Sequence, residues 1–96
     1  MERITDINDL KPGQKIISFN RGEVNRYEFL MIHPHNPEYI LCLNSIQDGV
    51  KIYSKTVYEN FFTNYSRKEV LEKLRDYYLR SAKECNQQIE KLSTEE

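Results

Sequence analysis

Residues 66–92 read SRKEVLEKLRDYYLRSAKECNQQIEKL, a stretch without glycine or proline. Ser66 is followed three residues later by Glu69, the capping-box spacing in which the two residues bond each other's backbone N–H groups at the start of a helix. The stretch therefore predicts one long helix over 66–92, about 40 Å long at 1.5 Å per residue. A compact body built from the roughly 65 preceding residues is only about 25 Å across. The helix is too long for its own domain, so another chain should cover the end that projects.

Apolar side chains recur along this helix every seven residues, from Leu71 to Leu92. Seven residues nearly complete two helical turns, so these side chains share one face. We call this set the helix stripe, and its members are Leu71, Leu74, Tyr78, Cys85, Ile89 and Leu92. Two interpretations stay open. Either the first half packs on the parent sheet while the second half frays, or a partner protein covers the stripe.

The first part of the chain predicts a β-rich body over about residues 3–55. Strands are predicted over 14–19, 27–33, 39–43 and 50–53, separated by turn signals that contain glycine, proline or asparagine. Because brief turns join these strands, they should be antiparallel. The second and third strands are apolar on both faces, so both faces need cover. Residues 4–10 are irregular and predict a short strand or a turn.

A second capping-box spacing, Thr56 to Glu59, predicts a short helix over 56–63. The whole chain is then a single α+β domain, with a small antiparallel β-sheet or SH3-like barrel followed by a short helix and the long C-terminal helix. The stretch DLKPGQKI over residues 9–16 resembles the way in which SH3-like small barrels begin. This resemblance implies a fold and assigns no function.

The charge of the 96-residue chain argues against a dedicated nucleic-acid protein. Fourteen Lys and Arg residues face fifteen Asp and Glu residues, which gives a formal net charge of −1. Nucleic-acid affinity, by contrast, comes chiefly from neutralising phosphates. Aromatic rings beside basic residues can still stack the bases of single strands. We therefore keep an alternative function, a small nucleic-acid-associated accessory protein that uses a basic and aromatic barrel face with Arg21, Arg26, Lys51 and Lys55.

The chain offers little for catalysis or for a cofactor. Its three glycines stand singly in turns, so no glycine-rich loop can hold a phosphate. His33 and His35 lie in one loop without a third ligand, so we expect no metal site there. Cys42 and Cys85 are far apart in the sequence, and we interpret both as reduced, small core residues. We predict no catalytic, cofactor-binding or metal-binding residue, and an enzyme subunit completed by a second chain is a third alternative.

No stretch of 18 apolar residues is present, and the first six residues contain no apolar run. We therefore expect a cytoplasmic protein with neither a membrane span nor a secretory signal. The function that the sequence favours is a non-catalytic protein-interaction or regulatory module acting through its C-terminal helix. Its partner is expected to be a second copy, giving a homodimer, or a larger protein on which the helix docks.

Overall fold

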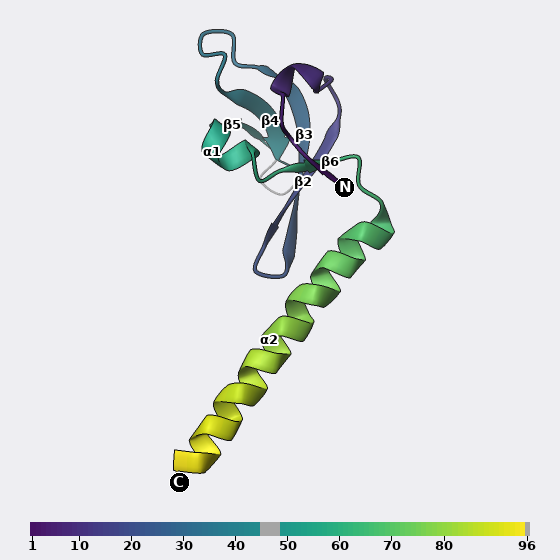
Figure 1. The fold of residues 1–96 in the computed structure, drawn as a ribbon. Helices are drawn as coiled ribbons and strands as arrows, with labels where there is room; N and C mark the ends of the chain where they lie inside the picture. Colours follow the sequence, from purple (N-terminus) through teal and green to yellow (C-terminus); the bar gives the residue numbers. More distant parts are fainter. Residues whose placement is uncertain (45–48, 96) are drawn as a thin grey trace.

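A computed structural model describes residues 1–44 and 49–95. It shows a β-sheet from which one long helix projects (Figure 1). Within these residues, six strands form one antiparallel sheet in the order β1-β6-β2-β3-β4-β5. The strands are β1 (Glu2–Arg3), β2 (Lys15–Asn20), β3 (Glu23–Ile32), β4 (Ile40–Asn44), β5 (Gly49–Tyr53) and β6 (Phe62–Thr63). The helical elements are the 3₁₀ helix η1 (Ile7–Asp9), α1 (Lys55–Tyr58) and α2 (Arg67–Glu95).

The sheet is open, with β1 and β5 at its two edges. Among the described residues, β1 pairs with β6 and β5 pairs with β4, and no pairing joins the two edges. The predicted α+β class, with an antiparallel sheet and a long C-terminal helix, is therefore confirmed. Closure into an SH3-like barrel is not confirmed.

A tight turn between β2 and β3 sets the register at the centre of the sheet. Arg21 and Gly22 both have positive φ angles, 49° and 81°. This conformation lets a two-residue loop match the right-handed twist of the two strands. Pairing begins immediately outside the loop, at Asn20 and Glu23. As a result, β3 starts earlier than the strand predicted over 27–33.

The short helix predicted over 56–63 is wrong in its position and its length. The helix starts after Ser54 and ends at Tyr58, so the predicted capping box does not start it. Phe62 and Thr63 form a strand instead. The physical reason is burial, because Phe61 packs in the cluster on one face of the sheet and Phe62 in the cluster on the other. Two consecutive side chains reach opposite faces in an extended chain and not in a helix.

Apolar side chains are buried on both faces of the sheet, as the two-faced strands predict. The larger cluster, here called the core face, comprises Ile4, Ile16, Tyr27, Phe29, Ile40, Cys42, Tyr58 and Phe61. On the opposite face, Ile17 and Phe62 pack against Val70 of α2. Partly buried Phe19 and Val24 extend this second cluster to the start of β3. The helix α2 therefore covers the opposite face over β6, β2 and the beginning of β3.

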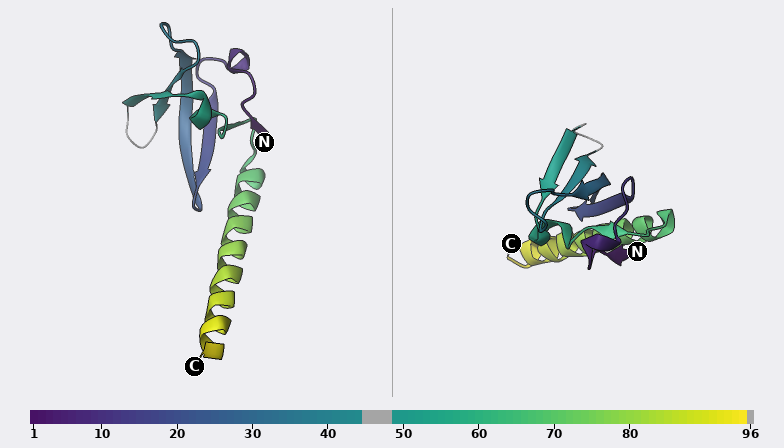
Figure 2. Two further views of the ribbon diagram at one scale, coloured as in Figure 1. Left: turned by 60° about the vertical axis from the view of Figure 1, so that its left-hand side comes forward. Right: turned by 90° about the horizontal axis from the view of Figure 1, so that it is seen from above.

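The helix α2 has 29 residues and begins with the predicted capping box. The Ser66 hydroxyl accepts a hydrogen bond from the backbone N–H of Glu69 at 3.1 Å, and the Ser66 N–H donates to the Glu69 carboxylate at 3.0 Å. The molecule measures 61 × 27 × 25 Å, with a radius of gyration of 17.6 Å. A compact chain of this length would have a radius of about 12–13 Å. The left-hand view in Figure 2 shows α2 continuing past the β2–β3 hairpin.

The tip of that hairpin contacts α2 closely. The Tyr78 hydroxyl donates a hydrogen bond to the Gly22 carbonyl oxygen at 3.0 Å. A Cβ atom built on Gly22 would lie 2.7 Å from the Tyr78 hydroxyl oxygen and 2.9 Å from a ring carbon of Tyr77. The two tyrosine rings would have to move away to admit a methyl group.

Gly22→Ala should therefore lower the free energy of unfolding more than Gly13→Ala does. Gly13 also has a positive φ, 87°, so both variants share the backbone penalty of about 1–2 kcal/mol. A Cβ atom on Gly13 would meet no atom within 4 Å, so that variant lacks the clash with α2. Urea unfolding of both variants measures the difference. Equal losses of stability would show that the hairpin tip does not hold the helix.

Candidate functional site

The first part of the helix stripe lies beside the body. Leu74 packs against the cluster of Ile17, Phe62 and Val70. Leu71 and Tyr78 lie on the same stretch of helix but expose 54% and 57% of their surface. The stripe thus remains accessible from solvent even where α2 touches the sheet.

The second part of the stripe lies beyond the body. Every residue over 82–93 is exposed, and Ile89 and Leu92 each expose 60% of their surface. Cys85 is exposed as well, so the prediction that it is a core residue is wrong. The helix outruns the sheet, and no described residue packs over this end. Burial of each of the two aliphatic side chains by a partner would contribute about 1.5–3 kcal/mol.

A second uncovered apolar surface lies on the sheet. The register pairs Met31 with Leu41, Leu41 with Ile52, and Leu43 with Val50. These side chains alternate with the residues of the core face, so they point to the opposite side of the sheet. We call this set the open sheet face: Met31, Leu41, Leu43, Val50 and Ile52. It lies outside the cluster that α2 covers, and Met31, Val50 and Ile52 expose 47%, 58% and 56% of their surface.

The total exposed area of the chain also indicates that surface is left for a partner to cover. The chain exposes 7316 Å², whereas a compact monomer of this size exposes about 5,800 Å². The excess is roughly 1,500 Å². Each partner buries about 800 Å² in an interface of standard size. The uncovered surface is large enough for a stable interface.

The structure distributes the basic residues of the alternative function over different parts of the molecule. Arg26 pairs across the strands with Ile17, and Lys51 pairs with Cys42. Ile17 and Cys42 belong to clusters on opposite faces of the sheet. Arg26 and Lys51 therefore lie on opposite faces too. Of the other two, Arg21 lies in the β2–β3 turn and Lys55 begins α1.

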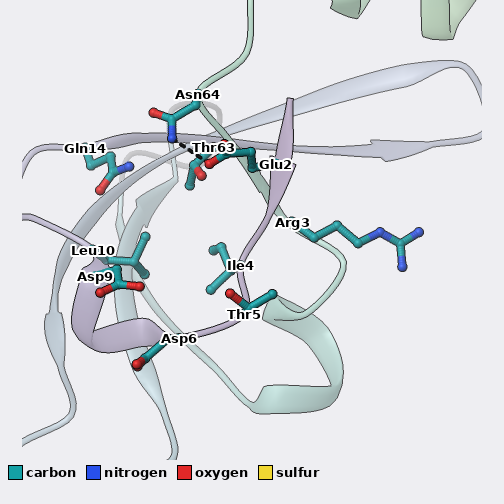
Figure 3. A pocket seen from close by; sticks show the side chains of 10 residues that line it. All are labelled: Glu2, Arg3, Ile4, Thr5, Asp6, Asp9, Leu10, Gln14, Thr63 and Asn64. Atoms are coloured by element: carbon teal, nitrogen blue, oxygen red, sulfur yellow. Dashed lines mark hydrogen bonds between the residues drawn. The ribbon is translucent and has the colours of Figure 1, made fainter.

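A small pocket of about 110 Å³ lies where β1 and η1 meet the chain after β6 (Figure 3). The carboxylates of Glu2, Asp6 and Asp9 line it. Asp6 caps η1 by accepting a hydrogen bond from the Asn8 backbone N–H at 2.9 Å, and Glu2 accepts one from the Asn64 side chain at 2.9 Å. The first contact is local to η1, and the second joins the N-terminal segment to the chain that follows β6. We assign the pocket no chemistry.

The two histidines shape the loop between β3 and β4. His33 Nδ1 accepts hydrogen bonds from the backbone N–H groups of His35 and Asn36, both at 3.1 Å. This ring nitrogen is therefore occupied by the loop itself. In the part of the chain that the structure describes, no group of three or more His, Cys, Asp or Glu side chains could hold a metal ion.

The two cysteines differ in reactivity because they differ in burial. Burial raises the pKa of the Cys42 thiol to about 12, so the reactive thiolate is scarce at neutral pH. Cys85 is free and exposed on α2. In the single chain, a thiol reagent should therefore label Cys85 and leave Cys42 unmodified.

Glu69 connects the helix cap to the N-terminal segment. Its carboxylate forms an ion pair with the Met1 ammonium group and accepts the Ser66 backbone N–H at 3.0 Å. The hydrogen bond from the terminal amine, followed by that from Ser66, lowers the pKa of Glu69 below its ordinary value. The contacts favour the ionised carboxylate, which also suits the positive end of the helix dipole.

Glu69→Gln should make stability less dependent on pH. Because the folded-state pKa of Glu69 is depressed, its contribution is present above the unfolded-state pKa and is lost as pH falls through the folded-state pKa. The variant should melt below the wild type at neutral pH, and the two melting temperatures should converge in acid. Glu72→Gln is the control, since the Glu72 carboxylate lies 3.8 Å from Lys68 in an exposed pair. A gap between wild type and Glu69→Gln that is independent of pH would contradict the assignment.

Comparisons of the chain with protein-family models, with curated proteins and with solved structures gave no match. Among residues 1–44 and 49–95, no helix combines the length and the apolar character needed to cross a membrane. The function is therefore inferred from the two uncovered apolar surfaces, on α2 and on the sheet.

Proposed function

We propose that this protein is a non-catalytic interaction module whose helix stripe binds a protein partner. The observation that carries the proposal is the uncovered helix end, where Cys85, Ile89 and Leu92 share one face and are exposed among the residues that the structure describes. A helical segment as short as residues 82–93 is only marginally stable in water when nothing packs against it. A partner that covers the stripe would both order this segment and bury its apolar side chains.

We infer that the partner is a second copy of the chain. A twofold axis allows each copy to cover the projecting end of the other, so that both ends are buried in one step. The formal net charge of −1 leaves little repulsion between copies. The excess of roughly 1,500 Å² per chain is more than the half-interface of a standard dimer requires.

Sedimentation equilibrium tests this proposal directly. The purified chain should be dimeric at ~100 μM and dissociate on dilution toward concentrations near its dissociation constant. A chain that stays monomeric throughout a series up to ~100 μM would overturn the homodimer. Dimer formation insensitive to changes in the helix stripe would show that another surface mediates it.

A further inference from the structure

The sheet has room for a second helix beside α2. Strands lie about 4.8 Å apart and a helix with its side chains is about 10 Å wide, so one helix covers about two strands. The six strands would span roughly 29 Å at that spacing. Because α2 covers β6, β2 and the start of β3, the width of about three strands remains free. The open sheet face occupies this width.

The chain's own α2 leads away from that face. It passes the hairpin tip at Gly22, where the Tyr78 hydroxyl is bound, and then leaves the body, as Figure 2 shows. Residues 79–95 of the helix would extend about 25 Å at 1.5 Å per residue. The two short axes of the molecule are 27 and 25 Å. The projecting segment is thus long enough to cross the body of a neighbouring molecule.

We propose that α2 of a second copy packs Cys85, Ile89 and Leu92 onto the open sheet face. This inference rests on the proposed function and specifies where the partner helix docks. It extends a contact already present within the chain, since α2 packs Val70 and Leu74 onto the adjoining part of the same sheet face. The incoming helix would lie alongside the resident one.

A groove at the boundary supports this placement. A concavity of about 520 Å³ lies between β3 and α2, and its apolar lining includes Val24, Leu71 and Leu74. A second concavity of about 360 Å³, which shares Arg26 and Tyr65 with the first, reaches Leu43 of the open sheet face; the paired side chains of Lys15 and Glu28 also line it. A helix seated there would contact the sheet below it and Leu71 of the resident helix beside it. The exposed position of Leu71 in the helix stripe is then explained as well.

Cross-linking between Cys85 and a cysteine placed on the sheet tests the docking site. Ile52→Cys and Val50→Cys each put a thiol on the open sheet face, while Lys51→Cys puts one on the same strand but on the other face. A short bis-maleimide is added to each dimeric variant, and linked peptides are identified by mass spectrometry. Cys42 should not compete, because it is buried. Urea unfolding of each variant establishes that the sheet is intact.

We expect intermolecular links from Cys85 to position 52 or 50 in at least several-fold greater yield than to position 51. Equal yields at positions 51 and 52 would overturn the docking site. Links between two Cys85 residues without any link to the sheet would also overturn it, in favour of helix–helix pairing, while the proposed function would stand. A monomer in sedimentation would remove the proposed function and this inference together.

Discussion

Replacing Ile89 and Leu92 together by Asp should raise the dissociation constant of the dimer at least about 100-fold. The two side chains are 60% exposed in the single chain, and a partner that buries them gains about 1.5–3 kcal/mol from each. A factor of 100 corresponds to about 2.8 kcal/mol. Buried carboxylates would weaken the contact further. Sedimentation equilibrium measures the shift, and the urea midpoint of the isolated monomer should change little.

A matched control places the same change of charge on the opposite side of the helix. Lys83→Asn combined with Gln87→Asp also adds two negative charges to the projecting segment. At 3.6 residues per turn, both positions lie well away from the helix stripe. This control should remain dimeric. Loss of the dimer in the control would indicate a general effect of charge or helix stability rather than contact through the stripe.

Phe61→Ala should lower the free energy of unfolding by about 3–5 kcal/mol, the range for large-to-small changes in a core. Phe61 is 3% exposed, stacks on Tyr27 with ring centroids 4.6 Å apart, and meets Tyr53 edge to face at 5.2 Å. Small domains have stabilities near the low end of 5–15 kcal/mol, so the variant should be close to unfolding. Urea unfolding checks this, with Val57→Ala as the exposed control. A loss below about 1 kcal/mol would contradict the assigned core.

The long helix was predictable because its signals are local. Ser66 and Glu69 cap it through bonds three residues apart, and the absence of glycine and proline carries it onward. Its projection beyond the body was also predictable, because a helix of about 40 Å is longer than a body of about 25 Å. The two-faced strands were likewise recognisable from their apolar runs, since such runs require cover on both sides.

The strand β6, the exposure of Cys85 and the open sheet face were not predicted from the sequence. They depend on long-range contacts that local patterns do not reveal. Residues 61–63 resemble a helix in their spacing, but Phe62 pairs with Ile17, which is 45 residues earlier in the chain. Cys85 has the apolar spacing of a core residue and is exposed because the sheet ends before the helix does. The open sheet face depends on the register of β3, β4 and β5 and on the part of the sheet that α2 covers. The sequence indicated this face only indirectly. The predicted strands over 27–33 and 39–43 are apolar on both faces, and the chain has a single long helix to cover them.

Amide hydrogen exchange along residues 79–92, measured at several protein concentrations, tests most directly whether a second copy covers the projecting helix. An uncovered segment of this length should exchange almost as fast as an unfolded chain, because few tertiary contacts stabilise it. We predict strong protection at ~100 μM that falls on dilution together with the dimer, while the strands of the core face stay protected throughout. Fast exchange of residues 79–92 at every concentration, in a protein whose sheet remains protected, would contradict the interaction module.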